Sequence, residues 1–187
     1  CVDALRRVGI ADPEARLAGY PHQFSGGMRQ RVAIAIALLH GPDLIIADEP
    51  TTALDVTVQG QILYEMQKLV RESGAALIWI THDLAVIAGL ADRIAVMYAG
   101  RIVEEGRVEQ VLDAPRHPYT VGLLESVPAN NDSGRALKQI PGMTPSMLRL
   151  PAGCAFRERC SRADERCAAQ PELVDRVRCH HPHARAA

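Results

Sequence analysis

The chain has 187 residues, which suits one domain or one domain with an appendage. Hydrophobic residues make up 48% of it and aromatic residues only 4%, so a core has to be packed from Leu, Ile, Val and Ala. The formal net charge of −1 excludes a strongly basic field for nucleic acid, and the longest uninterrupted apolar run, residues 32–39, is far too short to span a bilayer.

The first ten residues, CVDALRRVGI, start with Cys1 rather than Met and already have helical spacing, with Val2, Leu5 and Val8 on one face. We therefore expect the sequence to be a fragment whose N-terminal part is absent, and we prefer this to a processed mature chain. A short second helix is expected from Pro13.

The next stretch alternates helices with buried strands. Ser25 is a suitable N-cap for a helix through about Leu39, and residues 44–47 are apolar on both sides of the pleat, as in a strand covered on both faces. This alternation predicts an α/β fold, a sheet with helices on its faces. The further predicted elements are a helix at 56–72, a buried strand at 76–80, a short helix at 84–91, a hairpin of 93–97 with 101–105, and a short helix at 108–112.

The composition changes after about Leu124. Residues 128–151 contain Asn, Asp, Ser, Gly and four prolines, which is typical of a linker that follows the surface. From Gly153 onward, a small unit contains four of the five cysteines. The sequence therefore predicts a small Cys-rich C-terminal extension.

Two short motifs suit phosphate chemistry. Ser25-Gly26-Gly27 opens a helix, and its backbone N–H groups can approach a phosphate closely; the alternative is a tight turn with an ordinary N-cap. Asp48 and Glu49 end a strand, at the sheet edge where α/β proteins bind ligands. Asp48 would hold Mg²⁺ through water and Glu49 would polarise the attacking water, unless both are solvated acids before a Pro turn.

A histidine, His82, follows the next strand. From the neighbouring strand end it can hold a γ-phosphate by one hydrogen bond, although a lone His at a strand end is more often structural. The sequence has no G-x-x-x-x-G-K-[ST] phosphate loop. Neither of its two lysines, Lys68 and Lys138, follows a glycine, so this chain offers the β- and γ-phosphates no cradle.

Together, SGGMRQR (25–31), LIIADEPTTALD (44–55) and WITHDL (79–84) resemble the ATPase subunit of an ABC transporter over about residues 20–106. The resemblance implies a partial P-loop NTPase sheet. It identifies four family elements: the signature motif (Phe24 to Gln30), the Walker B strand (44–49), the D-loop (52–55) and the switch histidine, His82. The site residues that it implies are Glu49 and His82 for catalysis, Asp48 for Mg²⁺ through water, and Ser25, Gly26, Gly27, Gln30 and Asp55 for the nucleotide.

The same resemblance implies a head-to-tail dimer with a second ABC ATPase subunit, identical or related, and two ATP molecules between the subunits. The signature serine and glycines would bind the γ-phosphate of ATP held by the partner. The P-loop, the glutamine loop and the adenine-stacking aromatic of the family lie upstream of this sequence. We therefore expect this chain alone not to hydrolyse ATP.

The clustered cysteines are spaced C-x5-C-x6-C-x11-C. Four thiolates could bind an iron–sulfur cluster. They could instead bind zinc, although the C-x2-C pairs that are usual in zinc sites are missing. The cysteines could also form two disulfides, which a cytosolic location disfavours. The cysteines are Cys154, Cys160, Cys167 and Cys179. Three nearby histidines add possible ligands or simply lie on the surface: His180, His181 and His183.

Three further segments, RHPYTVGLLESVP (116–128), GCAFRERC (153–160) and CHHP (179–182), resemble the C-terminal region of oligopeptide and dipeptide importer ATPases. This resemblance implies peptide import and, in some members, a [4Fe–4S] cluster on the four cysteines. It also implies transmembrane permease subunits, an extracytoplasmic solute-binding protein as an indirect partner, no nucleic acid, and a peripheral position at the cytoplasmic face of the cell inner membrane.

The resemblance divides the chain into the C-terminal part of an ABC ATPase domain (1–113), a subfamily extension and linker (114–150) and the Cys-rich unit (151–187). Three alternatives stay open: a non-transport ABC ATPase of the translation or DNA-repair type, an importer for nickel or another solute, and a metal-binding module with a degenerate ATPase half. Peptide import is preferred because the non-transport proteins normally lack the R-H-P-Y-T segment and the Cys-rich tail.

Overall fold

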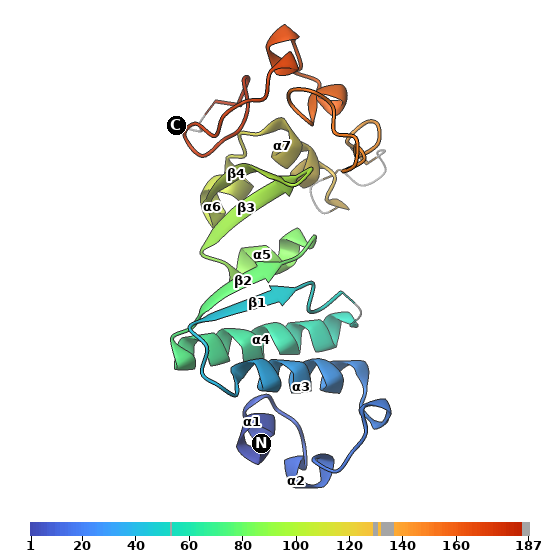
Figure 1. Cartoon of the computed structure of the whole chain (residues 1–187), viewed down its shortest axis with the longest axis vertical. Helices are drawn as coiled ribbons and strands as arrows, with labels where there is room; N and C mark the ends of the chain where they lie inside the picture. The colour runs from blue at the N-terminus through green and yellow to red at the C-terminus, as the bar shows by residue number, and fades with distance from the viewer. Residues whose placement is uncertain (53, 129–130, 132–136, 185–187) are drawn as a thin grey trace. The chain divides into compact units, whose positions relative to one another are not determined.

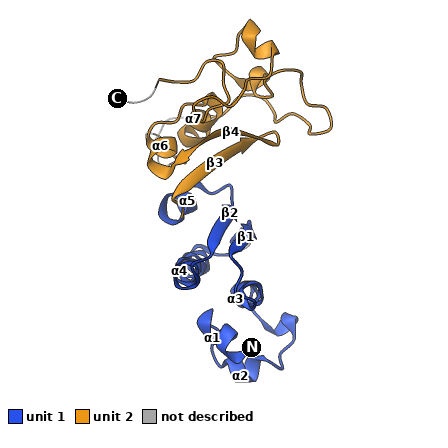
Figure 2. Ribbon diagram, turned by 60° about the vertical axis from the view of Figure 1, so that its left-hand side comes forward, with its two compact units in different colours: residues 1–90 blue, residues 91–187 orange. Residues whose placement is uncertain are grey.

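The computed structural model describes residues 1–52, 54–128, 131 and 137–184 of the chain. The chain forms two compact units, residues 1–90 and residues 91–187 (Figure 2). The boundary after Leu90 divides the chain so that most contacts between residues fall within one unit or the other. The predicted division at residues 113 and 150 rests on the sequence and stays a prediction.

The first unit contains a parallel pair of strands, β1 and β2, and the helices around it (Figure 1). The predicted strands and the long helices are confirmed, and a 3-10 turn, η1, precedes α3. The elements are α1 (Val2–Arg7), α2 (Pro13–Arg16), η1 (Pro21–Gln23), α3 (Gly26–Leu38), β1 (Leu44–Asp48), α4 (Val56–Ser73), β2 (Ala76–Ile80) and α5 (Leu84–Leu90).

Local signals in the sequence set the ends of the two long helices. Ser25 caps α3, because its hydroxyl oxygen accepts a hydrogen bond from the Met28 N–H at 3.3 Å. Asp55 caps α4 in the same way and accepts from the Val58 N–H at 3.0 Å. Gly74 ends α4 in the left-handed conformation, with a φ of 71°, which a glycine adopts without strain.

One face of the β1–β2 pair is packed against helices. Ile45 of β1 belongs to a buried cluster with Ile62 and Met66 of α4, and the partly buried Leu77 and Trp79 of β2 pack against it. This face fixes α4 beneath the strands.

The opposite face differs from the prediction. Leu44, Ile46, Ile78 and Ile80 are each 47–62% exposed, so within the described residues β1 is covered on one face only. Helices of the described chain therefore do not supply the second layer that an apolar parallel pair needs.

The second unit begins with the predicted antiparallel hairpin of β3 (Arg93–Tyr98) and β4 (Arg101–Arg107), with α6 (Val108–Asp113) following it. Ala99 and Gly100 both have positive φ angles, 47° and 74°, as a two-residue hairpin turn requires. A further helix, α7 (Pro118–Glu125), was not predicted, and the Cys-rich region contains two 3-10 turns, η3 (Arg157–Arg159) and η4 (Glu165–Ala168).

A buried carboxylate ties the segment before α7 to β4. Glu104 is 3% exposed, and its two carboxylate oxygens accept hydrogen bonds from the backbone N–H groups of Arg116 at 2.7 Å and His117 at 2.9 Å. His117 is itself buried, and its Nδ1 accepts from the Tyr119 N–H at 3.0 Å, which caps α7. The sequence therefore uses one acid and one histidine to fix the start of α7.

An aromatic cluster and backbone pairing attach the Cys-rich region to this frame. The ring of Phe156 lies 5.2 Å from that of Tyr98 and 5.4 Å from that of Tyr119, in edge-on geometry that aromatic pairs favour. Near the C-terminal end, the Arg178 N–H donates to the Val103 carbonyl at 2.8 Å, and the Glu105 N–H donates to the Arg176 carbonyl at 3.0 Å. The cysteines therefore sit on loops anchored to β3, β4 and α7.

His117 gives the second unit a pH-dependent stability. Burial lowers its pKa from 6.5 to about 4, against the opposing effect of a hydrogen bond with the Arg178 backbone. Above pH 6.5 the ring is neutral in both the folded and the unfolded state, and its contribution to stability is fully present. As the pH falls from 6.5 towards 4, the unfolded state gains a proton that the folded state does not, so the free energy of unfolding decreases. We expect a loss on the order of 3 kcal/mol over this range, measured by hydrogen exchange of the hairpin amides corrected for intrinsic rates.

A substitution isolates this effect. His117→Asn keeps an acceptor for the Tyr119 N–H but does not titrate, so it should be less stable at pH 7.5 and should lose this part of the pH dependence. The partly exposed His180, changed to Asn, serves as the control and should keep the wild-type profile. An unchanged pH profile in His117→Asn would show that another group is responsible.

Candidate functional site

The carboxyl ends of β1 and β2 meet because the two strands pair in parallel register, from Leu44 opposite Ala76 to Asp48 opposite Ile80. The residues that follow the two strands therefore lie at one edge of the sheet. The Glu49 N–H extends the pairing by one step and donates to the Ile80 carbonyl at 2.9 Å.

The structure brings together two of the predicted catalytic residues at this edge. The Nδ1 of His82 lies 3.3 Å from the Oε1 of Glu49, and the Thr52 hydroxyl donates to the Oε2 of Glu49 at 3.1 Å. The Glu49 side chain is about half exposed, and the His82 side chain is more exposed. The arrangement leaves a carboxylate and an imidazole open to a ligand and to water.

The backbone of Glu49 is strained. Its φ of 45° lies in the left-handed region, which a residue with a β-carbon adopts at a cost of about 1–3 kcal/mol. The turn that follows is fixed by the buried Thr51, whose hydroxyl oxygen accepts from the Gln59 amide at 3.1 Å. Asp48, the last residue of β1, is exposed beside it and offers the hard oxygen ligands that Mg²⁺ prefers.

The Ser-Gly-Gly turn lies against the segment that follows β1. A β-carbon on Gly26 would lie 3.4 Å from Leu54, and one on Gly27 would lie 2.5 Å from the Cγ1 of Val58. The turn is thus packed against the predicted D-loop and the start of α4. Gly27 is needed for this close approach of two helices, a role that the sequence pattern did not reveal.

Two other predicted nucleotide-binding residues lie near these elements. Asp55 is engaged as the N-cap of α4, which gives it a structural role in addition to the predicted one. Gln30 is partly buried on the first turns of α3. Their contact with a nucleotide stays a prediction.

The four cysteines of the tail are free thiols. Burial raises the pKa of Cys154 and Cys160 and raises that of Cys179 to about 11; neighbouring thiols of the group, Cys167 among them, add to each rise.

Backbone N–H groups are directed at these sulfurs. The His181 N–H donates to the Sγ of Cys179 at 3.3 Å, and backbone hydrogen bonds from Phe156 and Arg162 lower the pKa values of Cys154 and Cys160 in opposition to burial. Cys154 and Cys167 are also joined directly, since the Cys154 N–H donates to the Cys167 carbonyl at 3.0 Å. Hydrogen bonds to sulfur are common around iron–sulfur clusters, so these contacts at three of the four cysteines are compatible with the predicted cluster, which stays a prediction.

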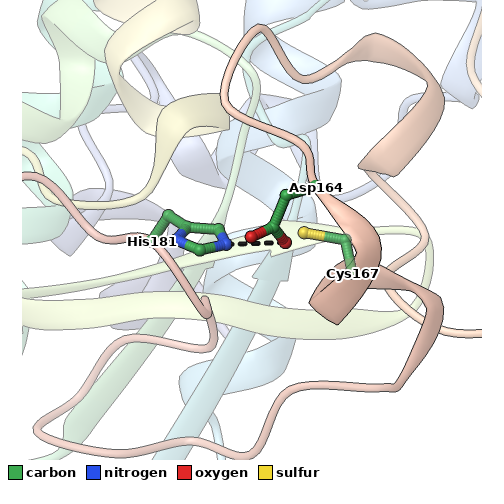
Figure 3. Close-up of side chains that lie close together, drawn as sticks. All are labelled: Asp164, Cys167 and His181. Atoms are coloured by element: carbon green, nitrogen blue, oxygen red, sulfur yellow. Dashed lines mark ion pairs between the residues drawn. The ribbon is translucent and has the colours of Figure 1, made fainter.

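A second group, which the sequence analysis missed in part, shares one of these cysteines. Side-chain ligand atoms of Asp164, Cys167 and His181 all lie within 4.8 Å of one another (Figure 3). His181 was considered only as a possible extra ligand, and Asp164 was not singled out. The D-x-x-C spacing on a 3-10 turn, which repeats every three residues, was the available signal.

No helix among the described residues is long and apolar enough to cross a membrane.

Two family models match the chain. Residues 1–52 match the ABC transporter family, and residues 103–167 match the C-terminal region of the oligopeptide/dipeptide transporter family. Between them, these matches include the Ser-Gly-Gly turn, the Asp48–Glu49 pair and three of the four tail cysteines.

Curated relatives are similar over nearly the whole chain. A putative peptide import ATP-binding protein of Brucella melitensis is 56% identical over 96% of this chain and 55% of its own length. The oligopeptide transport ATP-binding protein OppD of Escherichia coli is 52% identical over 93% of this chain and 52% of its own. The chain thus spans about half the length of the curated relatives it matches.

Among solved structures, the chain is similar to a dimeric ATP-binding cassette in a post-hydrolysis state, bound to ADP and phosphate. The two are 35% identical, the match covers 57% of this chain and 45% of that chain, and the TM-score is 0.49.

The close packing at Gly27 can be tested by its effect on stability. Gly27→Ala should lower the free energy of unfolding by about 1–3 kcal/mol, because the new methyl group collides with Val58. Denaturant unfolding followed by the fluorescence of Trp79, the single tryptophan, measures it. Gly26→Ala, with ordinary contact to Leu54, is the control and should cost less; adding Val58→Ala to Gly27→Ala should restore part of the loss. Equal stability of the two single variants would contradict the packing role.

Proposed function

Because this chain belongs to the ATP-binding proteins of ABC transporters, in the oligopeptide and dipeptide import class, we propose that the whole protein hydrolyses ATP to drive peptide import. The observation that carries the proposal is the meeting of Glu49 and His82 at the in-register ends of two parallel strands. The match to the importer C-terminal family over 103–167 supports the peptide class.

Glu49 is suited to act on the attacking water. Its carboxylate is positioned by the Thr52 hydroxyl and stays about half exposed, so one oxygen can accept a proton from a water molecule at the sheet edge. His82, with an imidazole nitrogen 3.3 Å from that carboxylate, can hold the γ-phosphate and thereby orient it towards the same water. The neighbouring Asp48 would hold Mg²⁺ through water; when bound, the ion neutralises phosphate charge.

The Ser-Gly-Gly turn is proposed to act on ATP held by a second subunit. Ser25, Gly26 and Gly27 form the first turn of α3, where backbone N–H groups lack partners within the helix and the helix dipole favours an anion. Gln30 and Asp55 complete the proposed nucleotide-binding set. The partner would be a second ATPase subunit, identical or related, arranged head to tail.

We further propose that the whole protein acts at the cytoplasmic face of the cell membrane, docked on transmembrane permease subunits and served indirectly by a solute-binding protein. The relatives are named as peptide, oligopeptide and dipeptide import or transport ATP-binding proteins, which supports an importer assembly of this kind.

Replacing Glu49 by Gln in the whole protein tests the catalytic role. The amide cannot accept the proton, so ATP turnover should fall about 100-fold or more while ATP binding persists, and an ATP-bound dimer should accumulate. Phosphate release and gel filtration with ATP measure the two effects. Glu72→Gln, at the exposed end of α4, is the matched control and should turn over ATP normally. Unchanged turnover in Glu49→Gln would rule out the general-base role.

We propose a [4Fe–4S] cluster on Cys154, Cys160, Cys167 and Cys179, supported by the spacing of the four cysteines and by the backbone N–H groups that hydrogen-bond Cys154, Cys160 and Cys179. The raised pKa values mean that the thiols hold their protons until a metal displaces them, so cluster binding should weaken as the pH falls.

Iron and acid-labile sulfide, assayed after anaerobic purification of the whole protein, test the cluster. We expect both in equal amounts, and we expect a Ser substitution at any of the four cysteines to lower them severalfold. Cys1→Ser is the control, because Cys1 is an exposed cysteine in the other compact unit. One equivalent of zinc without iron would contradict the proposal.

A further inference from the structure

Three different kinds of ligand atom converge in the tail. A carboxylate oxygen of Asp164, the Sγ of Cys167 and a ring nitrogen of His181 lie within 4.8 Å of one another (Figure 3). The closest approach is that of the His181 Nε2 to the Asp164 Oδ1, at 2.8 Å. Cys167 is buried, His181 is partly buried, and Asp164 faces the solvent. One open side therefore remains for an ion to enter.

Backbone hydrogen bonds hold this group in place. Asp164 caps η4, its Oδ1 accepting from the Arg166 N–H at 2.9 Å, and its carbonyl accepts from the Cys167 N–H at 3.2 Å. The Cys167 carbonyl accepts a hydrogen bond from the Cys154 N–H, and the His181 N–H donates one to the Sγ of Cys179. The three side chains are thus positioned before any ligand arrives.

The ring of the partly buried His181 faces Asp164. Its Nε2 atom is buried and lies 2.8 Å from the Asp164 Oδ1, with which it forms an ion pair when the ring is protonated. The two neighbouring histidines are engaged differently: the Nε2 of His180 lies 3.1 Å from the Ala169 carbonyl, and the Nδ1 of His183 lies 3.4 Å from the Arg162 guanidinium. His181 differs from these two histidines because its ring nitrogen lies near both a carboxylate and a thiol, two further ligand types that one metal ion can share.

We propose that Asp164, Cys167 and His181 form a binding site for a single zinc-class divalent ion when the tail carries no cluster. Sulfur, nitrogen and oxygen together suit borderline ions such as Zn²⁺ and Co²⁺, whereas Mg²⁺ and Ca²⁺ prefer oxygen alone. Three protein ligands leave a fourth position for water. Because Cys167 belongs to both ligand sets, the single ion and the cluster exclude each other. This site does not depend on the proposed ATPase activity.

Cobalt titration of the whole protein tests the site. The protein is freed of metal with a chelator under reducing, anaerobic conditions, and Co²⁺ is added while the visible and near-ultraviolet spectra are recorded. We expect the d–d bands of tetrahedral cobalt and a thiolate-to-cobalt charge-transfer band. His181→Gln and Asp164→Asn should weaken binding about 10-fold or more, Cys167→Ser should remove the charge-transfer band, and His180→Gln, the matched control, should bind like the wild type.

Variants of the other cysteines separate this site from the cluster. Cys160→Ser should lose iron and sulfide yet keep the cobalt spectrum, because Cys160 is not among the three ligands. If Cys160→Ser loses the cobalt signal, or if His181→Gln binds as tightly as the wild type, the four cysteines hold the ion and the proposal is wrong. Hydrogen exchange of the β3–β4 hairpin checks that each variant is folded. Failure of the cluster proposal would appear separately, as absence of iron and sulfide from the wild-type protein.

Discussion

The parallel pairing of β1 with β2 is the interaction on which the candidate catalytic edge depends. The register joins Asp48 to Ile80, so the residues after each strand emerge at the same place, and Glu49 meets His82 there. A slip of one residue would turn every side chain to the other face and separate the two. The register is held from below by Ile45, packed against Ile62 and Met66 of α4. The chemistry of the edge therefore rests on apolar contacts that no ligand touches.

One face of the β1–β2 pair has no layer of helices over it within the described residues. Leu44, Ile46, Ile78 and Ile80 form an apolar face that stays about half exposed, although strands of this composition are usually covered on both sides. The sequence indicated a doubly covered strand because both sides of the pleat are apolar. That prediction is wrong for the described residues, because helices cover the strands on one side only.

In the second unit, polar contacts have the positioning role that apolar contacts have in the first. Glu104 is buried and satisfied by two backbone N–H groups, and His117 is buried as the cap of α7. Phe156 packs its ring against those of Tyr98 and Tyr119, which attaches the first cysteine loop to the hairpin and to α7. The R-H-P-Y-T segment, which in the sequence served only as a mark of resemblance, thus has a structural reason: it joins β4, α7 and the Cys-rich loops.

The sequence by itself determined most of the helices and strands and their order, although not α7, because local signals such as the Ser25 cap and the spacing of apolar residues act over a few residues. It also determined which strand ends carry acids and histidine. Only the tertiary structure decided that Gly27 must admit Val58, that Glu104 is buried, and that Asp164 and Cys167 meet His181. These contacts join residues far apart in the sequence, through loops without periodicity. Hydrogen bonds and packing between distant segments set them, and no local pattern of residues records those forces.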